Sequence, residues 1–573
     1  MAQHGPGEAR AGGERGPLIP LVLAAAGIFP LLASLRHLDD NSLTSWSWVL
    51  MGRDLVGLWV LHLAALCAAL VLSRRALPVR WHLPAAVLGA FAAGVALAGE
   101  PEVVIDASRY FVQAKHLRLF GPVAFFRDWG GALAAWTDLP LPAFLYGVVF
   151  RLFGEHRLPQ QTLTAGLLAL TVFATARIGG LLWGAAIGAR GGLLLLAVPC
   201  LLVNVPLLMA DVPAMAAVTA ALWMFLETLE HGGAVRASSA SLALAAALLA
   251  KYSTWVLLCV TFGAILVLEA LRGRWAALAR GLAVAAAGAL APALFVLAKP
   301  ELVRSQLALL SGFQWEGLRR WVESYPSTFL FQAHPLLAAA ALAALWRGWR
   351  ARDRGTLVAA ALPLVLFALG ARRSRYLLPA FPMIALLAAR GLETLPCRAR
   401  RFAVLSAVGF SLVTVFAVYL PFLGWVNTAN LLAAGRFLDE RGVGAVEVAV
   451  AAAPGVSINP EIAAPLLDYH TAARIVVRGP SPPRPPEDEL RGSSFRFTWE
   501  GPLPSWYRGG AAFSPSGAAR VLITGESGAR PPVSIAAEVA GRAPDAVFAR
   551  DAVFRYRTFV SVWLPSPAAA HPR

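Results

Sequence analysis

Charged residues are scarce in this chain, and lysine is the scarcest of them. Only 14% of the 573 residues are Asp, Glu, Lys or Arg, whereas 58% are hydrophobic, and the mean hydropathy is +0.62. Soluble globular domains carry roughly 25% charged residues. The composition therefore excludes an ordinary soluble protein and predicts an integral membrane protein.

Cysteine is scarce as well. The four cysteines, Cys67, Cys200, Cys259 and Cys397, fall in or beside apolar runs, and none pairs with another at the spacing of a zinc motif. The tail after residue 430 contains no cysteine that could form a disulfide. Redox chemistry and a disulfide framework are therefore not indicated.

Apolar runs occupy most of the chain up to about residue 424. A bilayer core about 30 Å thick needs roughly 20 apolar residues per helix, and somewhat shorter runs are tolerated inside a bundle. Thirteen runs qualify as candidate spans: 17–35, 54–73, 84–98, 162–178, 191–208, 212–229, 237–250, 253–270, 281–298, 335–346, 355–370, 376–389 and 403–424. The expected fold class is an all-α polytopic membrane bundle of about 13 helices.

The formal net charge of +17 is explained by membrane topology. Arginine clusters follow the second, eighth, tenth and twelfth runs: Arg74, Arg75 and Arg80; Arg272, Arg274 and Arg280; Arg347, Arg350, Arg352 and Arg354; Arg390, Arg398, Arg400 and Arg401. All four clusters follow even-numbered runs, as the positive-inside rule requires if the N-terminus is cytoplasmic. No nucleic-acid motif accompanies this charge, so nucleic acid is not expected as a partner.

The same parity places the remaining loops. It puts residues 99–161, the 299–334 loop and the tail from about 430 outside the cytoplasm. Arg10 and Arg15 precede the first apolar run, whose length favours a retained helix over a cleaved signal peptide. We expect a multi-pass protein of the plasma (inner) membrane with a cytoplasmic N-terminus and an extracytoplasmic C-terminal domain.

Three segments follow from these patterns. Residues 1–83 form a cytoplasmic tail and two membrane helices, residues 84–429 form the main membrane module, and residues 430–573 form an outer domain. The outer domain contains short strand-like runs, "VEVAVAAA", "ARIVVRG", "ARVLITGES" and "VFRYRTFVSVWL", in the last of which Phe554 and Tyr556 alternate with arginines. A small α/β domain is expected there.

Acidic residues gather on the predicted outer side. Asp106 begins a segment that can be helical as far as Gly121, with Arg109, Tyr110 and Gln113 on the same side as Asp106. Two amphipathic helices are expected in this outer loop, one in "ASRYFVQAKHLRLFG" and a second, short one within "DWGGALAAWTDLPLPAFLYGVVFRLFGEHR".

Asp138 lies in that loop, and Asp211 lies between two spans at their outer ends. For Asp106 and Asp211, helix N-capping is the simpler interpretation. Acids at the apolar edge of a bundle are nevertheless unfavourable unless they are paired or used.

Basic residues accompany the acids on the outer side. Of the 50 Lys and Arg residues only Lys115, Lys251 and Lys299 are lysines, and the parity places all three outside. Arg372, Arg373 and Arg375 stand at an outer helix end, against the positive-inside trend. An anionic ligand such as a phosphate would explain them. An arginine on the outer face is expected to contribute little to folding.

Five stretches resemble the GT-C membrane glycosyltransferases in order and topology. They are "IDASRYFVQAKHL", "WTDLPLPAFLYGVVFRLFGEHR", "LLMADVPA", "LLAKYSTW" and "RRSRYLLPAFPMIALLAARGLE". The resemblance is nearest to the branch of protein O-mannosyltransferases and lipid A aminoarabinose transferases, and it covers roughly residues 84–424. It departs from the pattern because Ala107 follows Asp106 where many relatives have a second acid, and because two spans precede the usual first one.

The resemblance implies an enzyme that moves a hexose or pentose from a polyprenyl-phosphate donor, with inversion, to a hydroxyl of a protein, lipid or glycan acceptor. It makes Asp106 the general base, with Asp211 and Asp138 as further acids of the catalytic site. It assigns the donor phosphate to Lys251, Arg372, Arg373, Arg375, Tyr376 and Arg109.

Two questions stay open at this point. No cofactor is certain: no ligand cluster has metal-site spacing, and a divalent metal ion is left open. The alternative function is a transporter or flippase of a lipid-linked or anionic substrate, in which the charged residues would line a vestibule.

Overall fold

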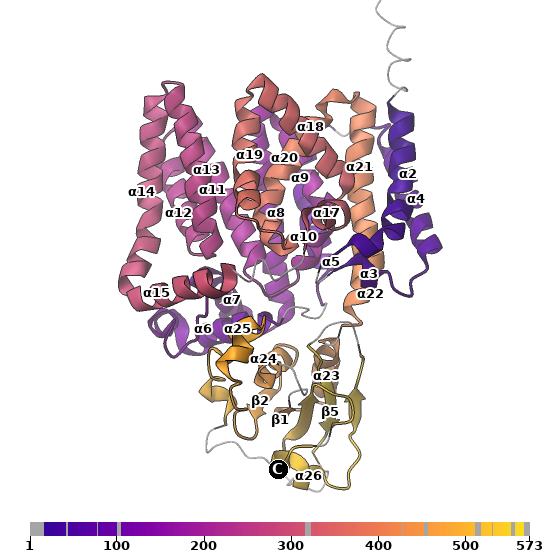
Figure 1. The fold of residues 1–573 in the computed structure, drawn as a ribbon, viewed down its shortest axis with the longest axis vertical. Helices are drawn as coiled ribbons and strands as arrows, with labels where there is room; N and C mark the ends of the chain where they lie inside the picture. Colours follow the sequence, from indigo (N-terminus) through magenta and orange to yellow (C-terminus); the bar gives the residue numbers. More distant parts are fainter. Residues whose placement is uncertain are drawn as a thin grey trace, which may run out of the picture.

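The apolar runs fold as helices because a backbone in lipid must satisfy its hydrogen bonds within its own segment. In the computed structural model these helices form a bundle, and a small α/β domain lies at one end of it (Figure 1). The structure describes residues 17–41, 44–76, 78–99, 105–315, 323–426, 428–451, 457–509, 517–529, 531–551 and 556–565. The predicted cytoplasmic tail before residue 17, residues 100–104 and 316–322 of the predicted outer loops, and Phe554 lie outside this set.

Seven helical segments in the described part of the chain are long and apolar enough to cross a membrane. They are α4 (Leu55–Leu72), α8 (Arg157–Trp183), α11 (Asp211–His231), α13 (Tyr252–Leu271), α14 (Trp275–Ala298), Ser374–Thr394, which contains α20 (Phe381–Gly391), and Cys397–Leu423, which contains α21 (Cys397–Val413). An eighth would be the pair Tyr325–Gln332 and α18 (Pro335–Ala351), which is bent by 120°.

Helix is present in each of the thirteen apolar runs of the sequence. Several are shorter than a full span: α2 (Leu18–Ser34), α12 (Ala234–Leu248), α19 (Arg354–Ala368), and the run at 191–208, which breaks into α9 (Ala185–Leu194) and α10 (Pro199–Asn204). The third run lies in α5 (Val79–Ala96). The helical fold class is confirmed.

Small residues let the central helices pack closely. A Cβ on Gly188 would lie 2.1 Å from the carbonyl oxygen of Ala176, so α8 and α9 meet backbone to backbone. A Cβ on Gly391 would lie 2.0 Å from the carbonyl oxygen of Ala340, which brings α20 against α18. Glycine at such contacts is typical of membrane helices, because close backbone approach supplies the packing that lipid cannot drive.

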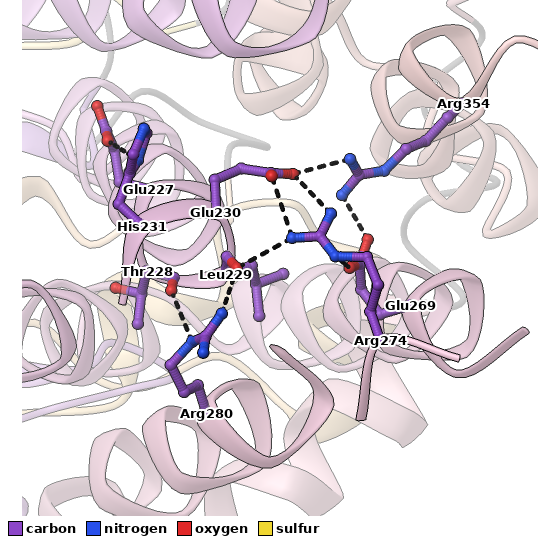
Figure 2. A network of polar contacts seen from close by, with 9 residues as sticks. All are labelled: Glu227, Thr228, Leu229, Glu230, His231, Glu269, Arg274, Arg280 and Arg354. Carbon is purple, nitrogen blue, oxygen red and sulfur yellow. Dashed lines mark hydrogen bonds and ion pairs between the residues drawn. The ribbon is translucent and has the colours of Figure 1, made fainter. Parts of the chain in front are cut away.

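A network of ion pairs fastens the end of the bundle away from the α/β domain (Figures 1 and 2). Glu269 is fully buried, and its carboxylate pairs with Arg354 and, at 3.1 Å, with Nε of Arg274. Glu230 accepts hydrogen bonds from Nη1 of Arg354 at 2.8 Å and from Nη2 of Arg274 at 3.0 Å. This far-end network of Glu230, Glu269, Arg274 and Arg354 joins the ends of α11 and α13 to the start of α19.

Three amphipathic or short helices lie across the opposite end, next to the α/β domain (Figure 1). They are α6 (Ala107–Asp128), α7 (Pro140–Phe153) and α15 (Pro300–Leu309). The sequence predicted α6 and α7, but it ended the first at Gly121. The chain instead kinks there, with φ of 82°, and continues helically from Pro122 to Asp128. Glycine makes this kink because a positive φ is strained for other residues.

The α/β domain is built on a five-stranded sheet in the order β2-β1-β3-β5-β4. Strands β1 (Ala445–Ala451), β2 (Arg474–Val477) and β3 (Ala519–Thr524) run parallel, and β5 (Phe559–Trp563) pairs antiparallel with both β3 and β4 (Ala546–Phe548). Helices α23 (Ala429–Glu440), α24 (Ala463–Asp468), α25 (Glu487–Gly492) and α26 (Val533–Val539) accompany the sheet. The four strands expected from the sequence are present, and the three-residue β4 was missed.

The topology prediction can be tested at the C-terminus. Helix α2 begins at the end of the bundle opposite the α/β domain, in keeping with termini on opposite sides of the membrane (Figure 1). A reporter that is active only in the cytoplasm should therefore be silent when fused after Arg573, and alkaline phosphatase fused there should be active. Cytoplasmic reporter activity would reverse the assignment of every loop.

The far-end network gives a stability prediction. Arg354→Met should lower the free energy of unfolding by about 3 kcal/mol, because it leaves the buried Glu269 carboxylate with only part of its compensation. Thermal unfolding of the purified protein in detergent measures this. Arg304→Met is the matched control, since Arg304 and Glu301 form an exposed pair that should contribute little. Equal melting temperatures for the two variants would contradict the assignment.

Candidate active site

Asp106 lies at the N-cap position of α6, yet its side chain makes no capping hydrogen bond. Its Oδ2 instead accepts a hydrogen bond from Nη1 of Arg375 at 3.0 Å, and its Oδ1 lies 3.8 Å from Nη1 of Arg109. Burial alone would raise the pKa of Asp106, but Arg375, Arg109 and Arg373 together lower it below its usual range. The carboxylate is therefore held charged by cations rather than by a helix end.

Asp138 accepts hydrogen bonds from three side chains of α6. Arg109 makes a bidentate contact with its carboxylate, through Nε to Oδ2 and through Nη2 to Oδ1 at 3.0 Å. Tyr110 donates its hydroxyl proton to Oδ1 at 2.9 Å, and Gln113 donates to Oδ2 at 3.3 Å. The side of α6 that the sequence predicted for Arg109, Tyr110 and Gln113 thus faces Asp138. Arg109 lies next to both Asp138 and Asp106.

Asp211 stands in the first turn of α11 and makes no capping hydrogen bond either, because the N-cap residue is Ala210. Its Oδ1 is 2.6 Å from Nζ of Lys251, the N-cap residue of α13. Asp211 is buried, whereas the Lys251 side chain is 29% exposed. Lys251 therefore neutralises a buried acid while part of its own side chain stays accessible.

The ring of Tyr376 lies near both cations that pair with Asp211 and Asp106, namely Lys251 and Arg375. Its ring centroid lies 4.7 Å from Nζ of Lys251, 5.4 Å from Cζ of Arg375 and 5.7 Å from Cζ of Arg373. Cations at such distances from a tyrosine ring are attracted to its face. The aromatic ring thus gathers three of the predicted phosphate ligands, and Arg372 remains exposed beside them.

The prediction that an arginine here contributes little to folding assumes an exposed side chain, and the structure contradicts that assumption for Arg375. Its side chain is only 9% exposed and is paired with Asp106. Arg373 is also buried, and its Nε lies 3.8 Å from a carboxylate oxygen of Glu323. Position in a predicted outer loop does not imply exposure here, because the C-terminal domain and the helices α6, α7 and α15 cover this end of the bundle (Figure 1).

The two other lysines, Lys115 and Lys299, join separate segments of the chain. Lys115 contacts Glu155 at 2.9 Å and Asp468 at 2.6 Å, and it thereby ties α6 to the C-terminal domain. Lys299 donates to the carbonyl oxygens of Arg127 and Trp129 at 2.6 and 3.0 Å, at the end of α6. Asp106, Asp138 and Asp211, with the cations paired to them, are called the acid cluster. Of the three lysines that the sequence predicted outside the cytoplasm, only Lys251 belongs to it.

Several supporting residues were not predicted from the sequence. Asn41, in the loop between the first two membrane helices, donates to Oγ of Ser374 at 2.9 Å, and Glu323 accepts from the Ser374 backbone N–H at 2.9 Å. Gln306 of α15 donates to the carbonyl oxygen of Asp138 at 3.0 Å. These partners are distant in sequence, so no local pattern could have indicated them.

Asp39 secures the same loop. Its carboxylate accepts hydrogen bonds from Ser327 at 2.5 Å, from Gln332 at 3.0 Å and from the backbone N–H of Trp46 at 2.7 Å. Burial raises the pKa of Asp39 to about 6 in spite of these donors. The loop between the two N-terminal helices, which the resemblance left without a counterpart, is thus joined through Asn41 to the segment that carries Arg373 and Arg375, and through Asp39 to Ser327 and Gln332.

The three acids Asp106, Asp138 and Asp211 do not meet around a common point where a metal ion could bind within the described structure. Asp106, Asp138 and Asp211 are each already paired with a cation. Within the described ranges no group of three or more His, Cys, Asp and Glu side chains could hold a metal ion. No step of a reaction is therefore assigned to a metal.

Comparison with known proteins identifies the fold. No family model and no curated protein matches the chain. Among solved structures, ArnT from Cupriavidus metallidurans bound to undecaprenyl phosphate matches with a TM-score of 0.55 and 15% identity, covering 86% of this chain and 98% of that one. The apo form of the same protein matches with a TM-score of 0.52 over the same shares, at 15% identity. The chain therefore shares the fold of these ArnT structures.

Proposed function

We propose that this protein is an integral membrane glycosyltransferase that moves a sugar from a polyprenyl-phosphate donor to an acceptor hydroxyl on the extracytoplasmic face. The observation that carries the proposal is the pairing of Asp106 with Arg375, beside the Lys251–Asp211 pair and Tyr376. A base and a set of phosphate-binding cations are the two requirements of such a transfer.

In the proposed step one bond forms, one bond breaks and one proton is transferred. The acceptor oxygen forms a bond to the anomeric carbon of the donor sugar, and the bond from that carbon to the phosphate oxygen breaks. The bonding electrons leave with the phosphate, the acceptor proton passes to Asp106, and attack from the opposite face inverts the anomeric carbon. Lys251, Arg373 and Arg375 are positioned to stabilise the charge that develops on the leaving phosphate.

Donor binding would also activate the base. With Arg375 at 3.0 Å, the Asp106 carboxylate is a weak base, because its pKa is depressed. A donor phosphate that draws Arg375 away would remove the nearest counter-charge, and the pKa of Asp106 would rise towards the range that suits a general base. Asp106 and the phosphate thus compete for Arg375, which links donor binding to base strength.

Asp211 and Asp138 have orienting roles in this scheme. Asp211 fixes the ammonium of Lys251 at 2.6 Å and leaves its other protons for an anion. Asp138 holds Nε and Nη2 of Arg109, while Nη1 of Arg109 has no hydrogen-bond acceptor within the described structure. This unsatisfied donor, 3.8 Å from Asp106, could bind a substrate oxygen.

The base assignment is tested by Asp106→Asn. Asparagine can still accept the hydrogen bond from Arg375 but cannot take a proton, so transfer should fall by about 10²-fold or more while the amount of folded protein holds. The assay is mass spectrometry of the envelope component that loses its sugar when the gene is deleted, expressed per folded molecule in membranes.

Asp211→Asn, made in parallel, tests whether the second acid is needed, and the exposed Asp551 supplies a control as Asp551→Asn. Transfer near the wild-type rate in Asp106→Asn would rule out its role as the base.

The donor assignment is tested by binding of undecaprenyl phosphate, the ligand of the similar ArnT structure, to the purified protein. Asp106→Asn should bind this probe several-fold more tightly than the wild type, because it releases Arg375 from a competing carboxylate. Adding Arg375→Met to that variant should then weaken binding by about 10-fold to 100-fold.

The double variant leaves no unpaired aspartate behind, so lost binding is not confused with lost stability. Arg118→Met is the control, because Arg118 is 41% exposed and pairs with Glu155 away from the cluster. Unchanged affinity in the double variant would remove Arg375 from the donor site.

A further inference from the structure

The C-terminal domain contributes an aromatic side chain to the acid cluster. Phe497 lies in the short helical turn Arg496–Trp499, and its ring centroid is 4.9 Å from Cζ of Arg109. The ring of Tyr110 lies 5.3 Å from the same atom. Arg109 therefore meets one ring from its own helix and one from a residue almost four hundred positions later in the chain.

Arg109 needs both its acid and its ring contacts to stay in place. Two of its nitrogens are bound to Asp138, and the third, Nη1, points towards Asp106 without a hydrogen bond of its own. A guanidinium fork held at one edge can still pivot about that edge. A ring on its face limits the pivot, because a desolvated cation is attracted to an aromatic face.

The segment that carries Phe497 is itself anchored on both sides. Asn459 donates to the side chain and the carbonyl oxygen of Thr498 at 3.0 and 3.1 Å, within the C-terminal domain. Towards the membrane, Cζ of Arg496 lies 5.4 Å from the ring centroid of Phe313. A Cβ on Gly501 would lie 2.6 Å from Cβ of Ala134, so this segment and the loop before Asp138 touch. Phe497 therefore cannot move away from Arg109 independently of the domain.

We propose that Phe497 is a positioning residue that holds Arg109 beside Asp106, and that the C-terminal domain is thereby a working part of the transfer site rather than an appendage. The consequence for sugar transfer rests on the proposed function. The geometric statement about Arg109 and Asp106 does not.

The charge environment of Asp106 gives a readout that needs no substrate. The charged groups that face it are Arg375 and Arg373 from the segment before α20 and Arg109 from α6, and all three lower the pKa of Asp106. If Arg109 loses its position, one of three compensating charges weakens, and Asp106 should take up its proton at higher pH. A residue that only stabilised the domain would leave this property unchanged.

The experiment compares Phe497→Leu, Phe497→Trp and Phe495→Leu in the full-length purified protein. Phe497→Trp keeps an aromatic face. Phe495→Leu removes the same ring from the same segment, where Phe495 packs against the domain core and has no described contact with Arg109. Dicyclohexylcarbodiimide, which reacts with protonated carboxyl groups, labels Asp106 as a function of pH, and peptide mass spectrometry measures the labelled fraction.

The labelling profile of Asp106 should shift to higher pH by roughly half a unit or more in Phe497→Leu, and stay near that of the wild type in the other two variants. Sugar transfer should fall about 10-fold in Phe497→Leu and recover in Phe497→Trp. An unshifted profile in folded Phe497→Leu, or an equal shift in Phe495→Leu, overturns the proposal. Should Asp106→Asn retain full transfer, Asp106 is not the general base, while the labelling result still decides the role of Phe497.

Discussion

The need to compensate buried carboxylates governs the architecture of this protein. An unpaired charge at the edge of an apolar bundle is strongly unfavourable, and Asp106, Asp138 and Asp211 are each paired with a cation. Two of these pairs join separate segments: Arg375 crosses from the start of the α20 span to α6, and Lys251 from α13 to α11. The contacts that assemble the candidate active site are therefore also contacts that hold together the end of the bundle next to the α/β domain.

This double role has a chemical implication. A buried ion pair adds little net stability on folding because the cost of desolvation offsets its attraction, but a buried charge left alone is strongly unfavourable. An incoming phosphate that takes over Arg375 keeps that cation compensated, because it exchanges one anionic partner for another. The protein can then offer its cations to a ligand without first solvating them. Supporting contacts from distant segments, such as Asn41 on Ser374 and Gln306 on the Asp138 carbonyl, keep the backbone in place during that exchange.

Much of the fold could be predicted from hydropathy and arginine placement, because a bilayer imposes length and apolarity on each span. The sequence also singled out the three acids and the cations that the structure brings next to them, since charges are conspicuous in so apolar a chain. Their partners were not. Sequence spacing could relate Arg109 to Asp106, but the contact of Arg375 with Asp106 spans 269 positions. The same limit hid Phe497, an unremarkable aromatic residue until the C-terminal domain is folded against α6. Hydropathy likewise could not show that Arg375 is buried, because burial there is produced by tertiary packing.

Helices α11 and α13 are tied to each other at both of their ends. Asp211 and Lys251 join them at one end, and Glu230, Arg274 and Glu269 join them at the other. At 1.5 Å per residue, the 21 residues of α11 measure about 31 Å, close to the thickness of a bilayer core. Neither helix can slide along the other without breaking a buried pair. Where tilting accommodates a bilayer of different thickness, the two helices tilt as one body, and the Asp211–Lys251 pair moves with them as a unit.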